Sequence, residues 1–119
     1  MYNAVLPTGL LNRPVFTTWS RDQGRHWSDV QKVTVGEKVI LGIFPRLVVM
    51  DNGVLAFITS RPGQTVVFGD GIVWTNELIL YKGQGTMNAM RQIAPNTLLA
   101  IFNDARRHFI AVPITVTKE

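Results

Sequence analysis

The chain of 119 residues is long enough for one domain, and its composition excludes several classes of protein. Hydrophobic residues make up 46% and charged residues 17% of the sequence, a ratio that excludes intrinsic disorder. The formal net charge is +4, but the 12 basic residues are spread evenly, and the longest basic run is Arg106–Arg107. Because nucleic-acid binding proteins gather Lys and Arg on one face, no nucleic-acid partner is expected.

Cysteine is absent, which excludes disulfides, cysteine zinc sites and thiol nucleophiles. The two histidines, His26 and His108, are too few for a metal site without carboxylate ligands, so neither a metal nor a cofactor is expected. No apolar run approaches the roughly 20 residues of a membrane helix, and no signal peptide is recognisable. We therefore expect no membrane partner, and the compartment is left open.

Short apolar runs separated by Gly, Pro, Asn and Asp predict strands joined by tight turns along the whole chain. In chain order the predicted strands are Val15–Ser20, Val30–Val35, Arg46–Met50, Val54–Ser60, Thr65–Phe68, Glu77–Leu80, Ala89–Ile93, Leu98–Phe102 and Phe109–Val116.

One of these strands is predicted to lie inside the protein. Val54–Ile58 is apolar at every position, which is typical of a strand covered on both faces, and it implies stacked sheets. The turn Asp51–Gly53 before it contains Asn-Gly, a strong signal for a hairpin.

The segment Asn96–Val112 allows a second interpretation. It lacks Gly and Pro, and its apolar residues also fall at helical spacing, so a helix competes with two strands. We favour strands, because Asn103-Asp104 interrupts the run and the rest of the chain reads as β.

A short motif occurs twice. Ser20–Trp27 has the spacing S-x-D-x-G-x-x-W, formed by Ser20, Asp22, Gly24 and Trp27. A shortened copy contains Asp70, Gly71 and Trp74. Each copy is followed by a strand-like stretch, and a period of about 40–50 residues with four short strands per unit is typical of propeller blades.

These residue types suit a structural role. In a tight turn, the Asp22 carboxylate accepts hydrogen bonds from backbone N–H groups, and Ser20 adds another. Gly24 allows a backbone angle that other residues resist, and Trp27 is expected to pin the turn onto the sheet.

The first motif resembles the Asp-box, or BNR repeat, of sialidase-like β-propellers. The segment Phe44–Phe57 looks like the first two strands of a blade in that superfamily, and Arg91–Asp104 is similar to a later blade. The resemblance implies an all-β fold, a partial propeller of about two to two and a half four-stranded antiparallel blades. It divides the chain into a blade remnant over residues 1–42, a blade over 43–82 and another over 83–119.

The resemblance also implies candidate site residues. Sialidases bind the substrate carboxylate with arginines, and Arg61 falls where one of them stands; Arg46 is a second candidate. An arginine of the family is replaced by Ile43, and no tyrosine nucleophile stands near Met87. Nucleophile and acid/base are therefore not identified in this chain.

Two functions follow from this pattern. In the first, the chain is a fragment of a sialidase-like glycoside hydrolase that acts on glycans. The alternative is a non-catalytic glycan-binding or scaffold propeller with a carbohydrate partner. Because so few blades leave edges uncovered, we expect either further blades in a longer chain or self-association of several copies.

Overall fold

The computed structural model describes residues 2–6 and 13–118, and this part of the chain is all-β, with no helix. The expectation about a signal peptide falls partly on residues outside it. The predicted all-β class is confirmed, and the helical alternative for residues 96–112 is wrong, because two strands occupy that segment. No helix that is long and apolar enough to cross a membrane occurs among the described residues.

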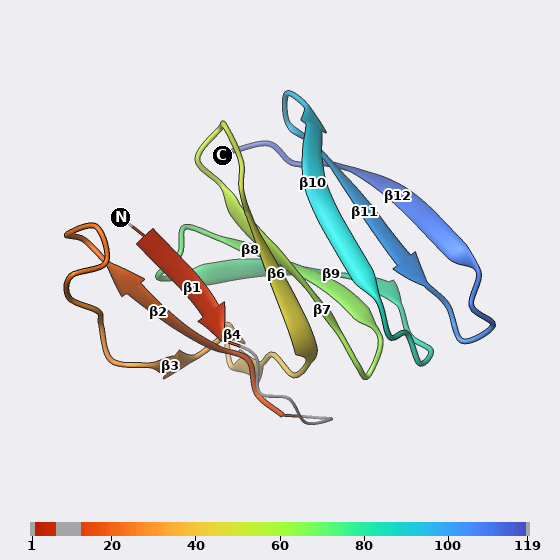
Figure 1. Cartoon of the computed structure of the whole chain (residues 1–119), viewed down its shortest axis with the longest axis horizontal. Coiled ribbons are helices and arrows are strands. Elements are labelled where there is room, and N and C mark those ends of the chain that lie inside the picture. Colours follow the sequence, from red (N-terminus) through yellow and green to blue (C-terminus); the bar gives the residue numbers. More distant parts are fainter. Residues whose placement is uncertain (1, 7–12, 119) are drawn as a thin grey trace.

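Three sheets lie side by side, with the largest in the middle (Figure 1). The first contains, in the order β1-β2-β3, the strands β1 (Tyr2–Leu6), β2 (Phe16–Ser20) and β3 (Gln31–Lys32). The central sheet has the order β5-β4-β9-β8-β7-β6, from the strands β4 (Thr34–Val35), β5 (Lys38–Val39), β6 (Ile43–Val49), β7 (Leu55–Ser60), β8 (Gln64–Gly69) and β9 (Trp74–Tyr81). The third has the order β10-β11-β12, from β10 (Asn88–Ala94), β11 (Thr97–Asn103) and β12 (Phe109–Thr115).

Strand β7 is the inner strand that the sequence predicts. All six of its residues are buried, and it pairs with β6 on one side and β8 on the other. One face, with Ala56 and Ile58, packs against Leu98 and Ala100 of the third sheet. The other face, with Leu55 and Phe57, belongs to a second core on the side of the first sheet. Both predictions for this region, the doubly covered strand and the hairpin before it, are confirmed.

One predicted strand is wrong in its extent. Instead of running from Val30 to Val35, the chain forms β3, leaves the first sheet at Val33 and enters the central sheet as β4. Val33 is fully buried and donates its N–H to Val15 O at 2.8 Å, while its carbonyl accepts from Ile40 N at 2.9 Å. These bonds at Val33 tie the two sheets together. Residue Val35 then pairs in parallel with Trp74 of β9.

Candidate functional site

The first Asp-containing turn is closed by its own hydrogen bonds. Asp22 Oδ1 accepts from Ser20 Oγ and from the His26 N–H, each at 2.8 Å, and the Gly24 N–H donates to Ser20 Oγ at 2.8 Å. Gly24 has φ +87°, a backbone conformation that favours glycine. Ser20 and Asp22 are thereby engaged in holding the turn.

The tryptophans of the two motifs have different environments. Trp27 is 48% exposed and donates Nε1–H to Gly24 O at 3.0 Å, so the expectation that it pins the turn onto the sheet is wrong. It lies in the loop beyond β2 and is not a member of either core cluster. Trp74 is the first residue of β9 and is only 4% exposed, within the core beside the first sheet.

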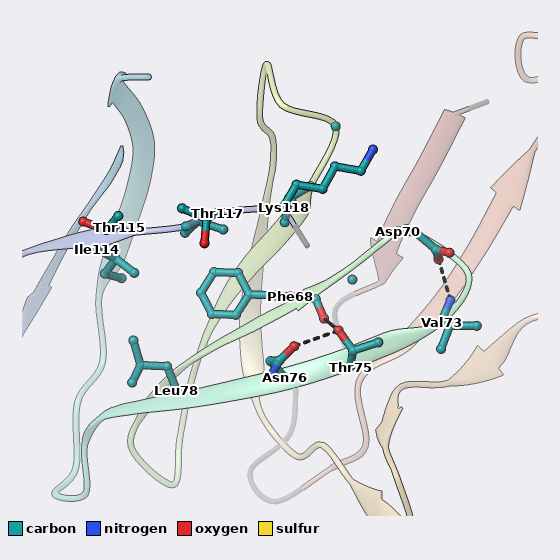
Figure 2. A pocket seen from close by; sticks show the side chains of 14 residues that line it. Phe68, Asp70, Val73, Thr75, Asn76, Leu78, Ile114, Thr115, Thr117 and Lys118 are labelled. Carbon is teal, nitrogen blue, oxygen red and sulfur yellow. Dashed lines mark hydrogen bonds between the residues drawn. The ribbon is translucent and has the colours of Figure 1, made fainter. Parts of the chain in front are cut away.

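In the second motif, too, the Asp carboxylate accepts hydrogen bonds from backbone N–H groups of its own turn. Asp70 Oδ1 accepts from the N–H groups of Ile72 and Val73, each at 2.8 Å, and Figure 2 shows the bond to Val73. Gly71, between Asp70 and Ile72, has φ +98°. The turn joins β8 to β9 and is shorter than the first one.

A third turn of this kind lies at Asp104, where the sequence predicted an interruption of the apolar run but not a copy of the motif. Asp104 Oδ1 accepts from the N–H groups of Arg106 and His108, each at 2.9 Å, and Asp104 Oδ2 contacts His108 Nδ1 at 3.2 Å. The same pair of contacts joins Asp22 to His26. The signal was the shared spacing, in which His follows Asp by four residues and an aromatic residue comes next.

These contacts stabilise the charged form of all three carboxylates. The His26 side chain, as the largest contribution, lowers the pKa of Asp22 below its ordinary value. The N–H of Val73 lowers the pKa of Asp70, and the N–H of His108 lowers that of Asp104. A general acid at neutral pH needs a raised pKa, so none of the three is arranged as one. No group of three or more potential metal ligands gathers anywhere in the described ranges.

The two predicted arginines lie on the β6–β7 hairpin. Arg46 is exposed on β6 and pairs across the sheet with Ile58, which places it on the face turned toward the third sheet. Arg61 follows the last residue of β7 in a tight turn, where its N–H donates to Gly63 O at 2.7 Å. Neither guanidinium forms an ion pair with the described residues.

Phe44 is a feature of this hairpin that the sequence did not reveal. The pairing of β6 with β7 is irregular between Ile43 and Arg46, and within this bulge Phe44 has φ +53°. A positive φ is strained for a bulky residue, and bulges of this kind re-aim side chains next to binding sites. The Phe44 side chain is 53% exposed. The hairpin therefore presents an aromatic ring two residues before Arg46.

A buried polar cluster connects Phe44 to the Arg61 turn. Asn88 Nδ2 donates to Ser60 Oγ at 2.8 Å and lies 3.5 Å from Phe44 O. Ser60 Oγ donates to Gln64 Oε1 at 3.0 Å, and Gln64 Nε2 donates to Met87 O at 3.2 Å. Asn88 Oδ1 is buried and has no hydrogen-bond partner among the residues that the structure describes. Ser60 and Gln64 flank Arg61, so the cluster fixes the base of its turn.

The tyrosine nearest to the expected nucleophile position has a packing role. Tyr81 stacks on Phe102, with ring centroids 6.1 Å apart, and its hydroxyl accepts from Ala105 N at 2.9 Å. Tyr81 therefore holds the third Asp turn against β9. Met87 is exposed immediately before β10, next to the buried cluster.

In comparisons with known proteins, no family model, no curated protein and no solved structure matches this chain.

Proposed function

We propose that this chain is a non-catalytic carbohydrate-binding module that recognises an acidic sugar. The proposed binding surface consists of Phe44, Arg46 and Arg61, and is called the Phe44–Arg61 surface below. The observation that carries the proposal is the strained, exposed Phe44 on the same hairpin as Arg46 and Arg61, which form no ion pair with the described residues. An exposed aromatic ring offers a flat apolar face for a sugar ring, and guanidinium groups match a carboxylate with paired hydrogen bonds.

The lowered pKa values of the three turn carboxylates argue against each of these three as the acid of a hydrolase. Retaining and inverting glycosidases both need a carboxylic acid that is protonated near neutral pH. The pKa values of Asp22, Asp70 and Asp104 are all lowered, and each carboxylate is occupied by its own turn.

A second candidate is that the chain forms part of a sialidase-like hydrolase of propeller architecture. The antiparallel run β6–β9 supports it, because it is a four-stranded meander like a blade, with an Asp turn between its third and fourth strands. The acid/base and the nucleophile would then come from other blades, either of a longer chain or of further copies.

The test is a titration of the whole chain with 3′-sialyllactose, followed by calorimetry and by amide chemical shifts. Lactose, which lacks the carboxylate, is the matched control sugar. We expect sialyllactose to shift the amides around Phe44 and Arg61, and Arg61→Ala and Phe44→Ala to weaken binding. Arg91→Ala, which removes an exposed arginine of β10, is the control variant.

Equal binding of both sugars, or full binding by Arg61→Ala, would exclude recognition of the acid by this surface. A fluorogenic sialoside added to the same samples distinguishes the binding module from the hydrolase, because only a hydrolase releases the fluorophore. Turnover that disappears in Arg61→Ala would favour the hydrolase over the binding module.

A further inference from the structure

A cavity of about 580 Å³ lies between strands β8 and β9 of the central sheet and the end of β12. Its apolar lining includes Phe68 of β8, Leu78 of β9 and Ile114 of β12. Figure 2 shows the Phe68 ring pointing across the cavity toward Ile114 and Thr117. The volume falls within the range of about 300–1,000 Å³ typical of sites for small organic ligands. The cavity is separate from the Phe44–Arg61 surface, none of whose residues line it.

The free edge of β12 disfavours an added β-strand as the occupant. The Val116 N–H donates to Asn96 O at 2.7 Å, directly across the β11–β12 ladder. Because hydrogen-bonded pairs alternate along an antiparallel ladder, the backbone nitrogen of Pro113 faces the free edge. Proline has no N–H to donate, so the edge is interrupted near its middle. A compact ligand suits this cavity better than an extended peptide.

The polar lining of the cavity has hydrogen-bonding capacity to spare. Thr75 Oγ1 donates to Asn76 Oδ1 at 2.9 Å, while Asn76 Nδ2 has no acceptor among the described residues. The Thr117 hydroxyl also has no partner in that part of the chain. Both groups lie beside the Phe68 ring (Figure 2). A ligand that presents hydroxyl groups around an apolar ring would satisfy them.

The charges around the cavity balance. Lys118 and Asp70 both line it, and Asp70 is ionised because backbone N–H groups hold its charged form. One positive and one negative charge give no preference for a charged ligand. This contrasts with Arg46 and Arg61 of the Phe44–Arg61 surface, neither of which forms an ion pair in the described part of the chain.

We propose that the cavity between β9 and the end of β12 binds a neutral pyranose sugar, stacked on Phe68 and hydrogen-bonded by Asn76 and Thr117. The apolar C–H face of such a ring packs on an aromatic face, and its hydroxyl groups both donate and accept hydrogen bonds. This site does not depend on the acidic-sugar site proposed above.

The experiment is a titration of the whole chain with maltose and with cellobiose, followed by amide chemical shifts. We expect shifts at Asn76, Ile114 and Thr117, and none around Phe44. Phe68→Leu keeps an apolar side chain but loses the ring face, and we expect about tenfold weaker binding, corresponding to the upper range of aromatic contacts. Thr117→Val tests the hydrogen bond at an exposed position where folding is not at risk.

Phe109→Ala, which removes an exposed aromatic residue elsewhere on the third sheet, is the matched control and should leave binding unchanged. Absence of shifts with both sugars would overturn the proposal, as would unchanged binding in both Phe68→Leu and Thr117→Val. Binding of an extended apolar peptide along β12 in place of sugar would overturn it too. Loss of sialyllactose binding in Phe44→Ala with retained maltose binding would show that the two sites are independent.

Discussion

Phe57 of β7 and Trp74 of β9 form an edge-to-face aromatic pair, with ring centroids 5.0 Å apart and ring planes inclined by 81°. Both side chains are buried on the face of the central sheet that looks toward the first sheet. Trp74 also pairs through its backbone with Val35, where the chain has just crossed between the sheets. The pair therefore lies where two sheets are held together.

Replacement of Phe57 by Ala is expected to destabilise the protein by about 3–5 kcal/mol, because a fully buried ring leaves a cavity. Phe109→Ala is the matched control, since the Phe109 side chain is 79% exposed and should change stability by less than about 0.5 kcal/mol. Urea unfolding followed by tryptophan fluorescence measures both. Similar losses in the two variants would contradict the position of this core.

Gln64→Ala tests the buried polar cluster at the base of the Arg61 turn. The change leaves Ser60 Oγ and Met87 O without the partners that Gln64 provides, and Gln64 itself is fully buried. We expect a loss of about 1–3 kcal/mol, the usual cost of buried polar groups left unsatisfied. The exposed Gln84→Ala serves as control in the same denaturation series, and a neutral Gln64→Ala would mean that the cluster contributes no stability.

Phe44→Gly is expected to separate stability from binding. Glycine adopts the φ of +53° without strain, and the relief of about 1–2 kcal/mol exceeds the roughly 0.5–1 kcal/mol of added chain entropy. The variant should therefore unfold at equal or higher urea concentration than the parent protein, while sialyllactose binding is lost. Phe44→Ala, which keeps the strain but lacks the ring, should lose binding without the gain. A clear destabilisation of Phe44→Gly would argue that the ring contributes to packing.

The third Asp turn predicts a pH dependence of stability. The N–H of His108 lowers the pKa of Asp104 in the folded chain, so the charged carboxylate favours folding above the unfolded pKa of about 3.9. This contribution is lost as the pH falls through the lowered folded value. Asp104→Asn should reduce the melting temperature at pH 7, and the two curves should converge in strong acid.

Asp29→Asn is the control for that series, because Asp29 is an exposed carboxylate outside the three turns. If Asp104→Asn kept a constant difference in melting temperature from neutral pH down to strong acid, the charge of Asp104 would not be the cause.

Much of the fold could be predicted because local signals agree with the packing. The uninterrupted apolar run Val54–Ile58 predicts a strand covered on both faces, and β7 is buried in that way. The turn at Asn52-Gly53 fixes the hairpin of β6 and β7. The break of the predicted strand at Val33 could not be predicted. Its cause is a pair of backbone hydrogen bonds to Val15 and Ile40, which depend on tertiary arrangement and leave no mark in the hydrophobic pattern.

The candidate site was only partly predictable. Arg46 and Arg61 could be predicted from the sequence. Phe44 could not, because bulky residues rarely adopt a positive φ and nothing in the sequence indicates one here. The link between Ser60 and Asn88 joins residues far apart in the sequence, which no local motif reveals. Asn103-Asp104 was predicted as an interruption of the apolar run, but its likeness to the first motif was not, because the Ser and Gly of that motif are Phe102 and Arg106 there.

The parallel pairing of Val35 with Trp74 also orders events during folding. Until β9 exists, β4 has only its hairpin with the two-residue β5. Bringing β4 and β9 together closes a long loop, and the chain entropy lost in doing so is offset only once the two strands are paired. We therefore expect the pairing of Val35 with Trp74 to form after the local hydrogen bonds of Val33 to Val15 and Ile40, because β9 is made later in the chain.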